Sequence, residues 1–154
     1  MKGKDFFDLC KKEFSYLLED FNFIVSEEKE PKWGFQVFMK NSTTGVIISF
    51  EFREFYVFLK ICKLENDAFV DDVKEIRSNS KINNFDYENL LLIRSPESIY
   101  PKYTDDTVFN DDLIEKIVSH HAKNLRENAS DVLNGDFRVF KELEKIVKER
   151  AGVG

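Results

Sequence analysis

The side chains that most often carry enzyme chemistry are few in this sequence. Its only histidines, His120 and His121, are adjacent, and adjacent side chains on a helix point about 100° apart. They therefore cannot hold one metal ion together as a pair four residues apart does. His121 falls on the apolar stripe of a predicted helix, so we expect it to be partly buried and hydrogen-bonded. We expect His120 to be exposed.

The two cysteines, Cys10 and Cys62, are too few for a disulfide framework and form no close pair for zinc. Cys10 lies on an apolar helical stripe, which predicts a small buried hydrophobic residue rather than a nucleophile. No local motif supports a nucleophilic pair of either cysteine with a histidine. The cysteine usage and an N-terminal segment without a secretory apolar core predict a cytoplasmic protein.

Motifs for phosphate or calcium are missing from the sequence. None of the six glycines belongs to a phosphate-binding loop, and the acidic doublets do not follow the calcium-loop order. We therefore expect no cofactor, no metal and no catalytic residue, and a protein that is not an enzyme. The alternative is a small enzyme or ligand-binding domain whose site is assembled from residues distant in sequence, and it predicts a deep pocket.

One segment has the composition of a protein-binding surface. Tyr100 and Tyr103 flank Pro101 and are followed by Asp105 and Asp106. Tyrosine, an aromatic residue with a polar hydroxyl, is enriched at protein–protein interfaces. Here the two tyrosines are followed by acidic residues. We take these two tyrosines and two aspartates as the candidate partner-binding residues. The alternative is that the tyrosines only anchor a long loop over the core while their hydroxyls reach water.

The charge balance indicates which partners fit. The chain has 23 Lys and Arg against 29 Asp and Glu, a net charge of −6, which disfavours binding to nucleic acid phosphates. Twelve acidic and five basic residues lie between Glu65 and Asp112. Such a segment is commonly a solvated surface, but it also speeds an encounter with a basic protein. We expect a non-enzymatic module that binds a basic protein, not a membrane, as a monomer or homodimer.

The N-terminal half has the clearest periodicity, within what we expect to be a single domain of residues 1–154. Apolar residues three and four apart predict a helix from Lys4 to Asp20. A short strand is expected around residues 21–25, ending in the charged run 27–30. Alternating apolar residues then predict three strands. Their inward sets are Trp33, Phe35, Val37 and Met39; Val46, Ile48, Phe50 and Phe52; and Phe55, Val57, Leu59 and Ile61.

Short connections between these strands favour an antiparallel meander of three or four strands. Residues 41–45 suit a longer hairpin loop with a left-handed residue, and Arg53-Glu54 leaves room only for a tight turn. The other face of the third strand is also partly apolar, with Tyr56 and Phe58. We therefore expect cover on both sides of the sheet, from C-terminal helices or from a partner.

The C-terminal half contains the helices that would provide this cover. Residues 84–92 suit a short helix capped by Asn84 or Asp86, and residues 95–103 an extended loop. A longer helix is expected from residue 110 or 111 to residue 133, with Gly135 as its C-cap. A second helix, capped by Asp136, should end near Arg150. The predicted fold is α+β, with the meander packed against N-terminal and C-terminal helices.

The C-terminal run from Val132 to Phe137, followed by Phe140 and Leu143-Glu144, resembles the ending of a broad group of small bacterial proteins. The resemblance implies an N-terminal helix, an aromatic-rich meander, an acidic segment and a closing helix pair. It concerns capping and core positions and implies no catalytic residue. Small acidic proteins of this size often serve as immunity proteins against bacterial toxins, an analogy of class that suggests an immunity-like role.

Overall fold

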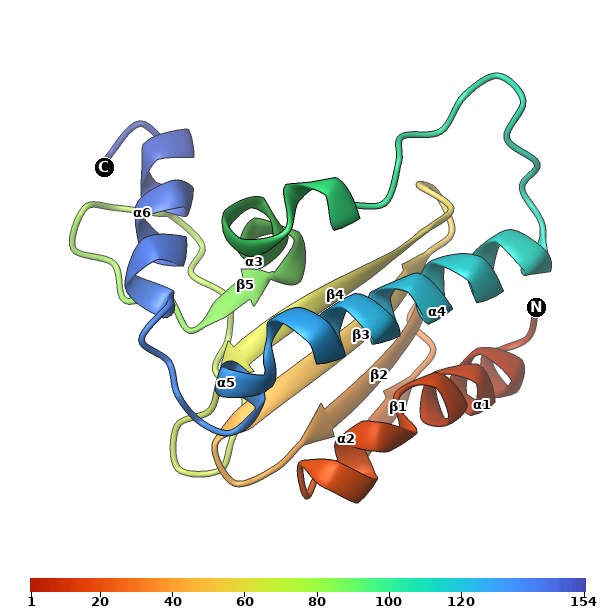
Figure 1. Ribbon diagram of the computed structural model, residues 1–154, viewed down its shortest axis with the longest axis horizontal. Helices are drawn as coiled ribbons and strands as arrows, with labels where there is room; N and C mark the ends of the chain where they lie inside the picture. Colours follow the sequence, from red (N-terminus) through yellow and green to blue (C-terminus); the bar gives the residue numbers. More distant parts are fainter.

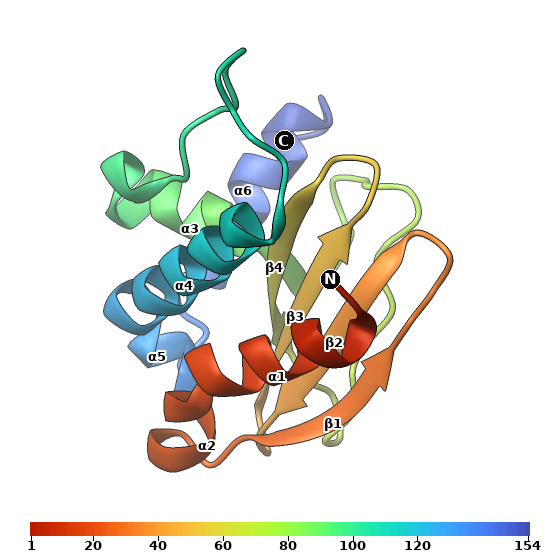
Figure 2. The same cartoon turned by 90° about the vertical axis from the view of Figure 1, so that its right-hand side faces the viewer.

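The computed structural model describes residues 1–154 and contains a five-stranded antiparallel sheet in the order β1-β2-β3-β4-β5 (Figure 1). The helices gather on one side of this sheet (Figure 2). The α+β fold with an antiparallel meander is confirmed, and a fifth strand extends it. The strands are β1 (Ile24–Lys29), β2 (Gly34–Lys40), β3 (Thr44–Glu51), β4 (Tyr56–Lys63) and β5 (Asn84–Asp86). The helices are α1 (Gly3–Glu13), α2 (Ser15–Asp20), α3 (Tyr87–Arg94), η1 (Pro96–Ser98, a 3-10 turn), α4 (Asp111–Asn128), α5 (Ser130–Leu133) and α6 (Phe140–Arg150).

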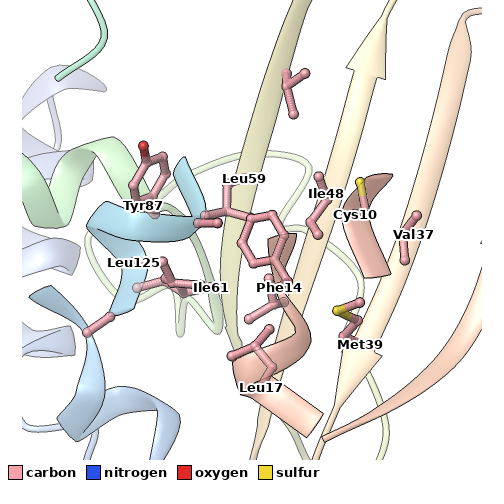
Figure 3. Packing of buried hydrophobic residues seen from close by; sticks show 14 of the residues in the cluster. Cys10, Phe14, Leu17, Val37, Met39, Ile48, Leu59, Ile61, Tyr87 and Leu125 are labelled. Carbon is pink, nitrogen blue, oxygen red and sulfur yellow. The ribbon is translucent and has the colours of Figure 1, made fainter. Parts of the chain in front are cut away.

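The predicted N-terminal helix is divided in two. Phe14 leaves the helical conformation, with φ −98° and ψ 19°, and separates α1 from α2. The apolar stripe nevertheless continues across the break, because Cys10, Phe14 and Leu17 are fully buried against the inner face of the sheet (Figure 3). Beyond the break the Tyr16 hydroxyl donates to the carbonyl of Ala122, 2.6 Å away on α4. The buried position expected for Cys10 is confirmed.

The inward faces of the three central strands are as predicted except at their ends. Trp33, Phe52 and Phe55 lie outside the strands, in the turns that join them. Trp33 and Phe52 are 45% and 46% exposed, and Phe55 has a positive φ of 47°. A turn ends the regular alternation of faces, so these three side chains are not buried in strands as predicted, although Phe55 still packs against the core beside Phe50. The buried inner-face residues are Phe35, Val37, Met39, Val46, Ile48, Phe50, Val57, Leu59 and Ile61.

The first strand lies later in the chain than predicted. The chain turns at Asn22, whose φ is +60°, so β1 begins only at Ile24 and ends at Lys29, within the charged run as predicted. This is an edge strand with an irregularity between Val25 and Glu27. Charged side chains and bulges on an edge strand hinder pairing with another chain. The charges therefore fit the edge position, which the sequence pattern alone did not indicate.

The β2–β3 hairpin is tighter than expected. Only residues 41–43 separate the strands, and no residue of the expected loop 41–45 is left-handed. The Asn41 side-chain oxygen instead accepts from the backbone N–H groups of Thr43 and Thr44, at 3.0 and 2.8 Å. Gly45 belongs to β3. A Cβ there would lie 2.2 Å from the ring of Phe69, so this glycine makes room for a packed side chain rather than a turn.

The segment predicted as one helix from residue 84 is a strand followed by a helix. Residues 84–86 pair with residues 60–62 of β4, and α3 begins at Tyr87. Asp86, one of the two expected caps, accepts from the backbone N–H of Glu88 at 2.9 Å. The expected extended loop at 95–103 begins with the 3-10 turn η1.

The predicted long C-terminal helix is interrupted at Ala129, which separates α4 from α5. Its Asn110 cap is confirmed, because the side chain accepts from the backbone N–H of Leu113 at 3.1 Å. Gly135 ends the run with φ +86°, as expected. Asp136 does not cap the last helix. Its carboxylate accepts from the backbone N–H of Arg138, and α6 begins only at Phe140, after a turn at residues 138 and 139.

A polar group at the centre of the core joins α3 and α4 to the sheet. His121 is fully buried, and its Nε2 lies 2.7 Å from the carbonyl of Val57. A carbonyl can only accept, so Nε2 carries the proton and Nδ1 accepts from the Tyr87 hydroxyl. The prediction for His121 is confirmed. His120 is half-buried, so its expected exposure is wrong, because its Nε2 donates to the carbonyl of Ser98 at 2.6 Å.

Buried His121 predicts a loss of stability in mild acid. Burial lowers its pKa to about 4, whereas an unfolded histidine has a pKa of about 6.5. The unfolded state therefore binds more protons between these two values, and the free energy of unfolding should fall as the pH drops from about 6.5 to 4. One pKa unit corresponds to about 1.4 kcal/mol, so the loss should reach roughly 3 kcal/mol. Urea unfolding across this pH range measures it, and an unchanged slope in His121→Gln would contradict the assignment.

Asp86 should have the opposite effect from His121 on the free energy of unfolding as the pH falls. Burial raises its pKa to about 6, so the folded state takes up its proton first and gains stability as the pH falls below 6. Asn is an equally good helix cap, so Asp86→Asn removes this titration while keeping the cap. We expect the variant to lose stability more steeply than the wild type between pH 6 and 4. Equal slopes in the two proteins would show that Asp86 does not titrate in this range.

Candidate partner-binding site

The four candidate residues divide into two pairs in the structure. Tyr100 and Tyr103 are half-buried and line a cavity beside β4. Asp105 and Asp106 are exposed and do not line it. They lie on the long connection between η1 and α4, which projects past the end of the sheet (Figure 1). The structure thus brings the tyrosines into a site and leaves the aspartates outside it.

The unpaired edge of β4 positions this site. β5 pairs only with Lys60, Ile61 and Cys62, which leaves the first half of β4 without a strand on that side. η1 and the connection that follows it pack here instead and are held at two points. His120 donates to the carbonyl of Ser98 at 2.6 Å, and the Tyr103 hydroxyl donates to the carbonyl of Phe55.

The space between β4, the start of α3 and the connection is a cavity of about 330 Å³. We call it the edge cavity. Its lining comes from three segments that are distant in sequence, as the alternative prediction of an assembled site requires, but it is an open hollow. The lining residues are Glu54, Tyr56, Phe58, Glu88, Ile99, Tyr100, Pro101, Lys102 and Tyr103.

Aromatic rings form most of the apolar wall of the edge cavity. Tyr56 lies at their centre, with ring centroids 5.0 Å from Phe58, 6.2 Å from Tyr103 and 6.3 Å from Tyr100. The cluster continues past the cavity to Phe109, whose centroid lies 5.3 Å from that of Tyr103 and which is 54% exposed. Exposed apolar side chains that adjoin one another mark an interaction surface more often than single ones do.

Two carboxylates accompany the rings. Glu88, in the first turn of α3, accepts a hydrogen bond from the Tyr56 hydroxyl at 2.6 Å. Burial and this nearby carboxylate raise the pKa of Tyr56 above its ordinary value, so the phenol remains a donor. Neither Glu54 nor Glu88 forms an ion pair, and Lys102 is the one cationic residue of the lining.

This set of groups is suited to holding a cation. The faces of aromatic rings attract Lys and Arg side chains, and a guanidinium also matches a carboxylate with paired hydrogen bonds. The lining holds no Ser, Thr, Cys or His that a neighbouring base could activate. No group of three or more His, Cys, Asp and Glu side chains in the chain is arranged to hold a metal ion.

The acidic segment 65–112 is less uniform than its composition indicates. Several of its carboxylates form ion pairs within the chain, including Glu65 with Lys81 at 3.0 Å and Asp67 with Lys40 at 3.7 Å. Asp105 and Asp106 form none. The carboxylates of the segment that form no ion pair therefore include Glu88 in the edge cavity and Asp105 and Asp106 on the connection, together with Asp71, Asp86, Glu97 and Asp112.

Sequence analysis missed Glu54 and Glu88 as parts of the site. Glu54 lies in a turn and Glu88 in a helix, where an acid has an ordinary structural explanation. Tyr56 and Phe58 did carry a signal, because they make the outward face of β4 apolar. The connection packs its tyrosines against Tyr56 on that face, and the helices gather on the other face of the sheet (Figure 2).

Comparisons of the chain with protein-family models, with curated proteins and with solved structures found no match. The similarity of the 132–144 run to small bacterial proteins therefore stays an expectation. None of the helices combines the length and apolar character needed to cross a lipid bilayer. The site must be interpreted from its own geometry.

The hydrogen bond from Tyr103 to Phe55 predicts how firmly the connection is held. Tyr103→Phe keeps the ring but leaves the Phe55 carbonyl without this donor, so it should cost about 1 kcal/mol of unfolding free energy. Hydrogen exchange in residues 99–109 should accelerate. Tyr100→Phe is the matched control, because the Tyr100 hydroxyl makes no hydrogen bond with the protein. Equal exchange in both variants would exclude Tyr103 as the anchor.

Proposed function

We propose that this chain is a non-enzymatic protein-binding module that recognises a basic partner at the edge cavity. The observation that carries the proposal is that four aromatic rings and two carboxylates that form no ion pair, Glu54 and Glu88, line one open hollow. A Lys or Arg side chain of a partner would meet both ring faces and carboxylate there. Arg is also among the residues enriched at protein interfaces.

The charge distribution supports a protein rather than a nucleic acid as the partner. A net charge of −6 repels phosphates, and the cavity offers carboxylates where a phosphate would need cations. Asp105 and Asp106 are exposed outside the cavity, where charges influence the rate of encounter more than the stability of the complex. We assign them the role of attracting the partner. Neutralising a basic toxin in the cytoplasm, as an immunity protein does, is one role that this binding would serve.

A small organic cation is the second candidate ligand. The edge cavity of about 330 Å³ reaches the lower end of the range for small-molecule sites, roughly 300–1,000 Å³. Its lining is also assembled from distant segments, as the ligand-binding alternative predicts. The openness of the hollow to solvent favours a side chain presented by a protein. Competition between a free cation and a protein partner separates the two.

Changing the charges in the edge cavity and changing those at Asp105 and Asp106 should affect binding differently. The tagged chain is first used to capture binding partners, at low and at high salt, from a lysate of the cells that make it. The captured partner is then purified for binding measurements. We expect Glu54→Gln with Glu88→Gln to weaken its affinity at least about tenfold, mainly through faster dissociation. Asp105→Lys with Asp106→Lys should slow association and reduce its salt dependence. Surface plasmon resonance gives both rates.

The control variant is Glu19→Gln with Glu127→Gln. Both residues are exposed and form no ion pair, and they lie on α2 and α4 away from the edge cavity. It removes the same charge and should leave both rates near those of the wild type. If the control weakens binding as much as the cavity variant does, net charge and not the cavity recognises the partner, and the proposal fails.

A further inference from the structure

A second hollow adjoins the edge cavity on the outer face of the sheet. It has a volume of about 260 Å³, and we call it the sheet hollow. Phe58 of β4 lines both hollows, so they meet at this ring. The helices lie on the opposite face of the sheet (Figure 2). The lining residues of the sheet hollow are Trp33, Gln36, Ser49, Glu51, Phe58, Lys60 and Asp86.

The strand register shows that the sheet hollow runs across the strands. Gln36, Ser49 and Phe58 are partners in one row across β2, β3 and β4, and Gln36 Nε2 donates to Ser49 Oγ at 3.1 Å. Trp33, just before β2, lines the same hollow and is 45% exposed. The floor of the hollow therefore runs across the strands, from the Trp33 side of β2 to the edge cavity beyond β4.

The width of this floor suits an extended chain. Neighbouring rows on one face of a sheet lie about 7 Å apart, twice the rise of about 3.4 Å per residue. In the next row the ring of Phe38 is covered by Phe69, 5.3 Å between centroids. Glu51 from the row on one side and Lys60 from the row on the other also line the hollow. A helix with its side chains is about 10–12 Å across, which is wider than the spacing between neighbouring rows.

Carboxylates line both hollows. Glu51 and Asp86 in the sheet hollow, like Glu54 and Glu88 in the edge cavity, form no ion pair, whereas Lys60 is already paired with Asp72. A second copy of this chain, with its net charge of −6, would bring like charges together. A basic segment matches the excess of carboxylates along the whole path.

We propose that the two hollows form one groove that binds an extended basic segment of the partner. This inference rests on the proposed function and adds the form of the partner. The groove crosses two strand spacings of about 4.8 Å, from β2 to β4, and then continues into the edge cavity. An extended segment of roughly five residues, at about 3.3 Å each, would fill this length. One basic side chain lies in the edge cavity and another lies against Trp33 and Glu51, at the β2 end of the sheet hollow.

The test uses a blocked hexapeptide with arginine as its second and sixth residues and serine and glycine between them. Binding to the full chain is followed by NMR at low salt. We expect shifts at the Trp33 indole and at the rings of Tyr100 and Tyr103 in the same titration. Replacing either arginine by citrulline, which removes the charge and keeps the shape, should weaken binding about fivefold or more.

Variants of the chain separate this inference from the proposed function. Trp33→Ala should weaken the hexapeptide about fivefold, and Trp33→Phe should restore most of the loss. Leu18→Ala, a change of another exposed apolar residue on α2, is the control and should have no effect. Trp33 lies outside the buried core, so its variants should fold.

Each outcome decides one of the two proposals. Full-strength binding to Trp33→Ala, with loss in Glu54→Gln and Glu88→Gln, would overturn the single groove and leave the edge cavity as the binding site. Full-strength binding to the cavity variant would overturn the proposed function itself. No binding of the hexapeptide to the wild-type chain would overturn the groove, because the groove by itself should hold this segment.

Discussion

The edge of β4 that β5 leaves unpaired is the constraint on which the rest of the structure depends. Carbonyls of alternate residues point to the same edge of a strand, and those of Phe55 and Val57 both need donors here. Side chains supply them: His121 of α4 binds the Val57 carbonyl and Tyr103 binds that of Phe55. A longer β5 would satisfy the same carbonyls and exclude both the helix contact and the edge cavity.

Two consequences follow from this use of side chains in place of a strand. His121 must stay neutral and buried, which links the packing of α4 to pH. The connection after η1 must lie close to β4, which places Tyr100 and Tyr103 over Tyr56. The proposed binding surface is thus a by-product of completing the edge, and its rings are already held in place by contacts within the chain. Such preorganisation lowers the entropic cost of binding.

The sequence predicted the parts of the fold that depend on local periodicity. The central strands and the helix faces were found because burial of one face imposes period two or 3.6. The ends were not, because turns such as that at Phe55 and the break at Phe14 depend on tertiary contacts. Of the candidate site, composition indicated Tyr100 and Tyr103, whereas Glu54 and Glu88 join them only through strand and helix placement. No local sequence pattern indicates that these glutamates lie beside the tyrosines.

Phe58 lies where the edge cavity and the sheet hollow meet, so a cross-linker at this position directly tests whether a basic segment binds there. Replacing it by the photo-reactive residue p-benzoylphenylalanine, in the cells that make the protein, allows a bound partner to be cross-linked and the attached peptide to be identified. The account predicts one main adduct, in a segment of a protein rich in Arg or Lys, and its loss in Glu54→Gln with Glu88→Gln. An adduct in an acidic segment, or no adduct beyond that of the control without light, would contradict it.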